Sequence, residues 1–309
     1  MELHQLRYFV AVAETGNFTR AAKRCFVSQP SLSQQIQKLE DELGHPLFDR
    51  LGRRAELTPA GRAFVARARR ILIDVDDAAR AVREQSGGGR VRLGMVPSVA
   101  PYLLPELLPR LAEAVPEAEL EVFEDFRTYL AEQVVRGNLE AAVLSLPPDD
   151  LALETELLIA EPLLVAMPKG HSLANKADLS LRDLAGQPFI MLGDSSSLAL
   201  QTRRFFGDHD LGLAVIARCA QVKTLKTLVA AGIGLAIVPK MAVGRDKVPG
   251  IVYREMTDAH PRRELMLVRH AERFHGRTEE AVAEVVRGVC RDVFGPPEPA
   301  ADGSGGVVR

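Results

Sequence analysis

The hydrophobic pattern of this chain changes at three consecutive glycines, Gly87–Gly89. Before them, apolar residues recur every three or four positions, the spacing that gives an α-helix one apolar face. After them, short apolar runs typical of strands alternate with helical segments, which favours an α/β layer with a largely parallel sheet. Because a run of glycines ends a helix and permits a hinge, the sequence predicts a helical N-terminal part joined to a separate α/β part.

Electric charge is divided along the chain in a similar way. Residues 1–70 hold 12 Lys and Arg against 7 Asp and Glu, whereas the rest of the chain holds 27 against 34. The overall net charge of −2 therefore hides a basic N-terminal segment on a mildly acidic body. This division indicates a nucleic-acid-binding module attached to a domain of another kind.

The basic segment is expected to contain three short helices, over residues 3–13, 18–24 and 29–43. Each has apolar residues at helical spacing and is bounded by a residue that breaks or caps a helix. The first helix should bury one face, made by Leu3, Leu6, Val10 and Ala13.

The second and third of these helices have the pattern of a helix-turn-helix. Phe26–Ser28 predicts a tight turn between them, Ser28 suits the capping position of the third helix, and Pro30 suits its first turn. Gly44 is expected to end the third helix. Residues 47–57 then predict a small hairpin, with its turn near Gly52.

The third helix carries a polar face that suits the major groove of DNA. Its apolar face is formed by Leu32, Ile36, Leu39 and Leu43. Amide and hydroxyl side chains opposite that face can pair with base edges, and Lys38 can reach a phosphate. A solvated face is the alternative, but the hairpin that follows carries three arginines, which suit the minor groove or phosphates. The predicted DNA-binding residues are Thr19, Gln29, Pro30, Ser31, Ser33, Gln34, Lys38, Arg50, Arg53 and Arg54.

A long helix should follow over residues 58–86, with Thr58 as its cap and Pro59 as its first residue. Its apolar residues repeat at alternating spacings of four and three, as in a coiled coil. We expect no partner for this seam nearby in the sequence, so the same helix of a second chain is the predicted partner. The predicted dimerisation residues are Phe64, Ala68, Ile71, Val75, Ala78 and Val82.

The remainder predicts two α/β lobes joined by crossing strands, with a cleft between them. We expect lobe I over residues 90–162 and 266–295, and lobe II over 163–265. The full division is then 1–57 for DNA binding, 58–89 for the linker helix and hinge, 90–295 for the two lobes and 296–309 for a disordered tail.

Several runs in the first 65 residues match one known DNA-binding module in order and spacing. They are Leu6–Glu14, Asn17–Ala22, Ser28–Ile36, Leu39–Glu40, Gly44–Arg50 and Leu57–Gly61. In these runs the chain resembles the winged helix-turn-helix of LysR-type transcriptional regulators. The resemblance continues through the linker helix and both lobes, to about residue 295.

The resemblance implies a fold and a set of partners. The fold is a winged helix-turn-helix, a long linker helix and a two-lobed effector domain like that of periplasmic binding proteins. The partners are double-stranded operator DNA, a small-molecule effector and further copies of the chain, which form a dimer through the linker helix and commonly a tetramer. RNA polymerase is an open candidate for a further partner, and activation and repression both stay open.

The cleft between the lobes is the expected effector site. Helices that begin at strand ends present free N–H groups and hydroxyls, which attract anions, although the hydroxyls could instead only cap their own helices. Family positions that commonly bind effectors match Ser98, Thr128 and Ser196. The predicted effector-binding residues are Ser98, Val99, Thr128, Ser195, Ser196, Ser197 and Cys219, and the predicted effector is a small anionic metabolite.

The lobes most resemble the peroxide-sensing, OxyR-like branch of the family. In that branch a cysteine after a Gly-containing turn reacts with peroxide, and here Ser197 stands at the matching position. Serine cannot be oxidised to a sulfenic acid or form a disulfide, so the usual peroxide chemistry is not expected. A redox-responsive regulator that uses Cys219 stays open as an alternative.

Other classes of protein are also weighed. No Gly-x-Ser-x-Gly elbow occurs, and the seven histidines show no metal-ligand spacing, so we predict neither an enzyme nor a metal or cofactor site. A two-lobed solute-binding or enzymatic protein stays an alternative, and the solute-binding one is disfavoured by the lack of a secretion signal. With three scattered cysteines and no apolar stretch of membrane length, the chain is expected to reside in the cytoplasm and away from membranes.

Overall fold

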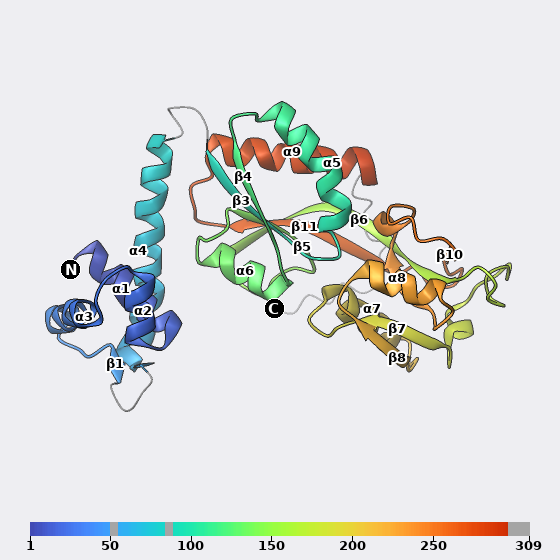
Figure 1. The fold of residues 1–309 in the computed structure, drawn as a ribbon, viewed down its shortest axis with the longest axis horizontal. Helices are drawn as coiled ribbons and strands as arrows, with labels where there is room; N and C mark the ends of the chain where they lie inside the picture. The colour runs from blue at the N-terminus through green and yellow to red at the C-terminus, as the bar shows by residue number, and fades with distance from the viewer. Residues whose placement is uncertain (50–54, 84–88, 296–309) are drawn as a thin grey trace. The chain divides into compact units, whose positions relative to one another are not determined.

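The computed structural model of the chain describes residues 1–49, 55–83 and 89–295 (Figure 1). The chain divides into two compact units, residues 1–86 and residues 87–309. The predicted hairpin-tip residues Arg50, Arg53 and Arg54, the hinge before Gly89 and the predicted disordered tail lie outside the described residues.

Unit 1 is a helix-turn-helix domain followed by a short hairpin and a long helix. Its elements are α1 (Leu3–Thr15), α2 (Phe18–Arg24), α3 (Gln29–Leu43), β1 (Phe48–Asp49), β2 (Glu56–Leu57) and α4 (Pro59–Arg83). Strands β1 and β2 pair antiparallel, with Phe48 opposite Leu57. The three short helices and the hairpin predicted from the sequence are therefore confirmed.

The predicted caps are confirmed as well. The Ser28 hydroxyl accepts a hydrogen bond from the Ser31 amide at 3.3 Å, and the Thr58 hydroxyl accepts one from the Gly61 amide at 3.0 Å. Gly44 ends α3 with φ +70°, a left-handed conformation that glycine adopts without steric cost. Local chemistry thus sets the limits of these helices.

The predicted buried face of α1 is partly wrong. Leu3 is exposed and Val10 is half-buried, whereas Leu6, Phe9 and Val12 form the buried face. The Phe9 ring packs against Phe48 at a centroid distance of 5.3 Å. A ring this large dominates the area that the helix can bury, so the face turns toward it.

The expectation that the seam of α4 has no partner nearby in its own chain is also wrong for its first half. Ala68 is buried in the hydrophobic core of unit 1, and Phe64 and Ile71 are partly buried and pack against that core. The Phe64 ring lies 5.2 Å from that of Phe9, centroid to centroid. The beginning of α4 is thus an integral part of the helix-turn-helix core.

Unit 2 is an α/β unit whose strands and helices follow one another along the chain. Its main elements are β3 (Arg90–Met95), α5 (Ala100–Ala114), β4 (Glu119–Glu124), α6 (Arg127–Val135), β5 (Ala141–Ser145), β6 (Leu153–Pro168), β7 (Pro188–Leu192), α7 (Ser197–Asp208), β8 (Ala214–Cys219), α8 (Val222–Ala230), β9 (Ala236–Pro239), β10 (Ile251–Arg254), β11 (Arg262–His270) and α9 (Arg277–Phe294). The sequence did not predict β10 or the first half of β6.

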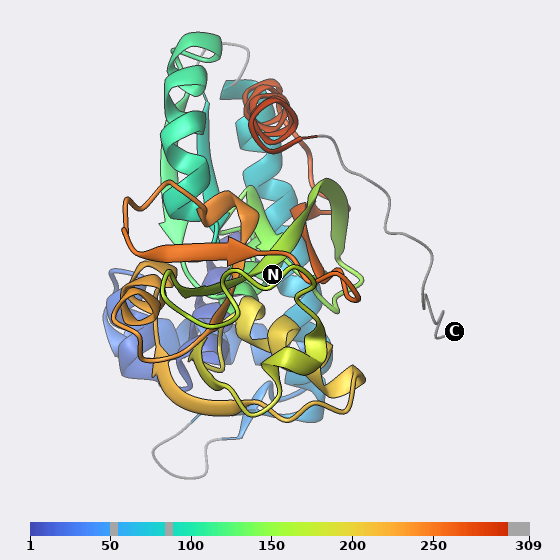
Figure 2. The same cartoon turned by 90° about the vertical axis from the view of Figure 1, so that its right-hand side faces the viewer.

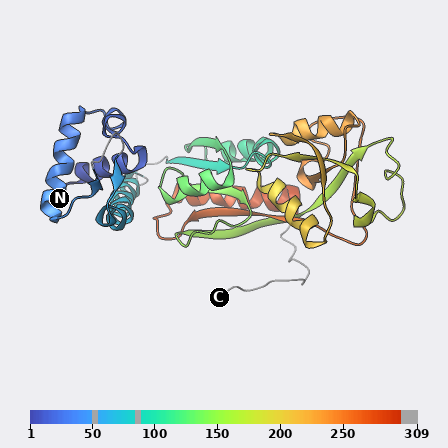
Figure 3. The same ribbon diagram turned by 90° about the horizontal axis from the view of Figure 1, so that it is seen from below.

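Two long strands join the lobes of this unit. The large sheet has the order β10-β6-β11-β5-β3-β4, with β9 also paired to β6, and β7 and β8 form a second small sheet. Strands β6 and β11 extend from lobe I into lobe II (Figure 3). Helices α5 and α9 pack together over one face of the large sheet, and α6 covers the other (Figures 1 and 2).

The expectation of a largely parallel sheet is wrong. The pairs β3–β4, β3–β5 and β7–β8 are parallel, but every pair that involves β6 or β11 is antiparallel. The reason is that the two crossing strands return the chain between lobes instead of continuing a strand–helix–strand repeat.

Candidate functional site

The predicted DNA-binding residues that the structure describes lie on the outside of unit 1. On α3, Gln29, Pro30, Ser31, Gln34 and Lys38 are exposed. Ser33 is half-buried, and Thr19 on α2 is exposed. Leu32, Ile36 and Leu39 turn the opposite face of α3 into the core, where all three are fully buried. The polar face of α3 is therefore available to a partner.

Charge is unevenly distributed along α3. From Thr15 to Leu39 the sequence contains no Asp or Glu, whereas Asp41 and Glu42 are exposed near the end of the helix. The Glu42 carboxylate pairs with the N-terminal ammonium group at 2.5 Å. Because phosphates repel carboxylates, the N-terminal half of α3 is the half that suits DNA.

The buried Glu40 is a structural residue that the sequence analysis did not identify. Its Oε1 accepts hydrogen bonds from the backbone amides of Leu47 at 2.7 Å and Phe48 at 3.2 Å. The carboxylate therefore joins the end of α3 to the start of the hairpin. The sequence feature that indicates such a role is a single Glu on the apolar side of an amphipathic helix.

The second half of the α4 seam differs from the first. Val75 is half-buried, while Ala78 and Val82 are exposed, and 69% of Val82 is accessible. In unit 1 by itself, this part of the predicted dimerisation surface is therefore largely accessible to solvent.

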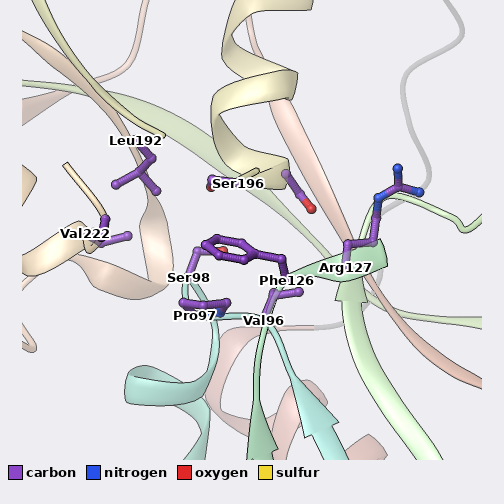
Figure 4. Close-up of a pocket in the computed structure, with 10 residues that line it drawn as sticks. Val96, Pro97, Ser98, Phe126, Arg127, Leu192, Ser196 and Val222 are labelled. Atoms are coloured by element: carbon purple, nitrogen blue, oxygen red, sulfur yellow. The ribbon is translucent and has the colours of Figure 1, made fainter. Parts of the chain in front are cut away.

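A narrow pocket lies between the two lobes of unit 2 (Figure 4). Its volume is about 10 Å³, which is about enough for one water molecule. The Phe126 ring lies in the middle of the lining side chains, and Arg127 stands at their edge. The lining residues are Val96, Pro97, Ser98, Phe126 and Arg127 from lobe I, and Leu192, Ser196, Ser197, Ala220 and Val222 from lobe II.

The structure brings together three of the predicted effector-binding residues, Ser98, Ser196 and Ser197. The other four are each next to a lining residue in the sequence but do not line the pocket themselves. They are Val99, Thr128, Ser195 and Cys219. Phe126 and Arg127 line the pocket but are not among the predicted effector-binding residues; they are the capping residue and the first residue of α6.

Four helices, α5, α6, α7 and α8, begin at this pocket. Their capping residues, Val99, Phe126, Ser196 and Gln221, make no side-chain hydrogen bond to their helices. The idea that the hydroxyls only cap their own helices is therefore wrong for Ser196. Helix N-termini without side-chain caps favour an anion, and among the described residues no Asp or Glu lines the pocket.

A buried ion pair lies beside the pocket and contacts Ser98, one of the residues that line it. The Arg263 side chain is fully buried, and its Nε donates to Glu161 Oε1 at 2.7 Å. Its Nη1 donates to Ser98 Oγ at 3.0 Å. Since Ser98 Oγ accepts from the guanidinium, the hydroxyl hydrogen of Ser98 is left for an acceptor elsewhere.

This ion pair sits where the two lobes meet. Arg263 on β11 lies directly opposite Glu161 on β6, and these are the strands that connect the lobes. Glu161 Oε2 also accepts a hydrogen bond from the Met241 amide at 2.6 Å. Neither Arg263 nor Glu161 was predicted as a site residue, because their pairing depends on the register of two strands far apart in the sequence.

The three cysteines have free thiols. The Cys219 thiol lies 3.6 Å from the carbonyl oxygens of Met191 and Gln221, and burial raises its pKa. Burial likewise raises the pKa of Cys290, to about 12. A raised pKa lowers the fraction of reactive thiolate at neutral pH.

Among the residues that the structure describes, no three or more His, Cys, Asp or Glu side chains gather as a metal site would require. No helix in the same part of the chain is both long enough and apolar enough to cross a membrane.

Comparison with known proteins defines the family. The profile of the LysR substrate binding domain matches residues 84–291, and that of the bacterial regulatory helix-turn-helix protein, lysR family, matches residues 3–62. The chain belongs to the LysR family of transcriptional regulators. It is therefore a DNA-binding regulator with an effector-binding domain.

Two proteins illustrate the similarity of this LysR-family regulator to known ones. The DNA-binding transcriptional dual regulator OxyR of Escherichia coli is 36% identical over 291 residues, which cover 93% of this chain and 95% of that protein. Among solved structures, a full-length OxyR variant from Pseudomonas aeruginosa superposes with a TM-score of 0.69 at 31% identity, covering 93% of this chain and 98% of that one.

Proposed function

We propose that this regulator binds operator DNA through the N-terminal half of α3 and the hairpin arginines. The absence of acidic residues from Thr15 to Leu39 supports this use of α3. The proposed base contacts come from Gln29, Ser33 and Gln34, with phosphate contacts from Arg50 and Arg53.

The proposed signal is a small anionic metabolite bound between the lobes of unit 2. The observation that carries this proposal is the meeting of four helix N-termini, none capped by a side chain, at a pocket whose described lining contains no acidic residue. An effector larger than one water molecule has to displace the Phe126 ring or separate the lobes. Separation of the lobes on binding would change the angle between them.

The proposed assembly is a dimer through the second half of α4, and a tetramer of two such dimers. Val75, Ala78 and Val82 are the residues proposed to meet their counterparts in the other chain. A change of lobe angle would then alter the spacing of the DNA-binding domains across the tetramer.

Redox sensing is the second candidate, because curated relatives include hydrogen peroxide-inducible genes activators. Two features of this chain argue against it. Ser197 occupies the position where the family resemblance puts the reactive cysteine, and the pKa of the Cys219 thiol is raised by burial.

Genome-wide mapping of the sites bound by this protein tests the proposal. Bound sites next to genes for the metabolism of an anionic compound would support it and would name candidate effectors. Bound sites confined to genes of peroxide defence would contradict the anionic-metabolite proposal.

A further inference from the structure

Phe26 has an unusual conformation and an unusual exposure. Its side chain is 94% exposed, and its backbone is left-handed, with φ +57°. That backbone conformation is sterically disfavoured by a β-carbon, and glycine, or asparagine with its short polar side chain, more often occupies it. An apolar ring in water adds a second unfavourable feature at the same residue.

The turn between α2 and α3 imposes this conformation. The Phe26 amide donates to the Lys23 carbonyl at 3.2 Å, and the Val27 amide donates to the Ala22 carbonyl at 3.0 Å. Cys25 and Val27, on either side, pack against the core of unit 1. The fold therefore needs the left-handed turn, but it makes little use of the phenyl ring.

The surroundings of Phe26 suit a polyanion. Phe26 lies in the middle of the stretch from Thr15 to Leu39 that has no Asp or Glu. Lys23 is exposed just before it, and Ser28 and Gln29 are exposed just after it at the start of α3. The ring is thus continuous with the surface proposed to enter the major groove.

We propose that the Phe26 ring packs on the apolar face of a deoxyribose beside the groove that α3 enters. This proposal rests on the proposed placement of α3 in DNA. Contact with a sugar adds affinity without reading the base sequence, so Phe26 would strengthen binding to every duplex. The strain and exposure of the free protein would be offset when the ring is covered by DNA.

The test compares Phe26→Gly and Phe26→Leu in the full chain with the exposed control Leu151→Ala from unit 2, whose side chain is fully accessible. The probes are a duplex that the wild-type chain selects from a random library and a mixed-sequence duplex of equal length. Binding to both is measured at several salt concentrations, together with the melting temperature of each variant.

We expect Phe26→Gly to bind both duplexes about fivefold more weakly, the loss expected for roughly half the burial of a phenylalanine. Phe26→Leu should keep most of the affinity, and Leu151→Ala should bind as wild type. The dependence of affinity on salt should not change, because no phosphate contact is removed. The melting temperature of Phe26→Gly should stay equal or rise, since glycine relieves the left-handed strain.

Three results would overturn the proposal. They are wild-type affinity in Phe26→Gly, a loss confined to the selected duplex, and a loss accompanied by a lower melting temperature. Gln29→Ala in the same assay separates this inference from the proposed function. If Gln29→Ala keeps full discrimination between the duplexes, the proposed placement of α3 in DNA is wrong. If Gln29→Ala loses discrimination while Phe26→Gly binds as wild type, the proposed placement of α3 stands and the proposed contact of the Phe26 ring is wrong.

Discussion

The proposed DNA-binding surface of α2 and α3 and the pocket of unit 2 are built from different kinds of chain segment. The first comes from one continuous stretch, residues 15–39, whose proposed DNA-binding side chains are mostly exposed. The second gathers residues from Val96 to Val222 and is supported by the buried pair of Arg263 and Glu161. Substitutions on the surface should therefore alter DNA binding without changing the stability of the fold. Substitutions in the buried ion pair should alter both effector binding and stability.

The largest expected effect is on the buried ion pair. Arg263→Met leaves the Glu161 carboxylate buried without its partner, which should lower the free energy of unfolding of unit 2 by about 3–5 kcal/mol. Denaturant unfolding followed by hydrogen exchange in each unit measures this change, and unit 1 should be unaffected.

The matched control for that change is an exposed ion pair in the same unit. Arg110 pairs with Asp292 at 2.7 Å, with side chains 41% and 58% exposed. Arg110→Met should cost at most about 1 kcal/mol. If Arg263→Met and Arg110→Met lowered the free energy of unfolding equally, the buried ion pair beside the pocket would contribute no more to stability than an exposed one.

A smaller effect is expected on the exposed surface of unit 1. Gln29→Ala should reduce discrimination between selected and mixed-sequence duplexes by about 1–3 kcal/mol and leave the melting temperature unchanged. Arg53→Ala is the contrasting variant, because it should weaken binding to both duplexes and lower the salt slope by about one. If Gln29→Ala behaves like Arg53→Ala, α3 does not read bases through this residue.

The smallest expected effect concerns pH and unit 2. His275 Nδ1 lies 2.6 Å from Glu279 Oε1, and this hydrogen bond raises the pKa of His275 above its ordinary value of 6.5. Arg269 and Glu154 are the other charged groups that act on it. The resulting stability is fully present below pH 6.5 and is lost as pH rises through the higher pKa of the folded state.

Urea unfolding between about pH 6 and about pH 9, the range in which a histidine titrates, checks this prediction. Wild-type stability should fall across that range, and His275→Gln should flatten the slope. An unchanged slope in His275→Gln would mean that the pair does not contribute to the pH dependence.

The contrast between the two units also explains what the sequence could predict. The limits of α2 and α3 follow from neighbouring residues, such as Ser28 and Gly44 at the ends of α3, and the sequence predicts them correctly. The partners of Phe64 could not be predicted, because Phe9 is brought to it by the tertiary fold.

In unit 2, even less of the site can be predicted from the sequence. Ser98 was predicted as a site residue from a family resemblance, but its hydrogen bond to Arg263 joins residues 165 positions apart. No local pattern marks Arg263 as the partner of a pocket residue, because arginines at the start of an apolar strand usually lie in solvent. The same holds for Phe126, whose place in the pocket depends on both lobes.

The most direct test of the central proposal measures binding of the selected duplex in the presence of a panel of small carboxylates and, separately, hydrogen peroxide. We predict that at least one carboxylate changes the affinity of the wild-type chain by about fivefold or more. The change should be absent in Ser98→Ala and retained in Cys219→Ser. A response to peroxide alone that Cys219→Ser abolishes and Ser98→Ala keeps would contradict the proposal.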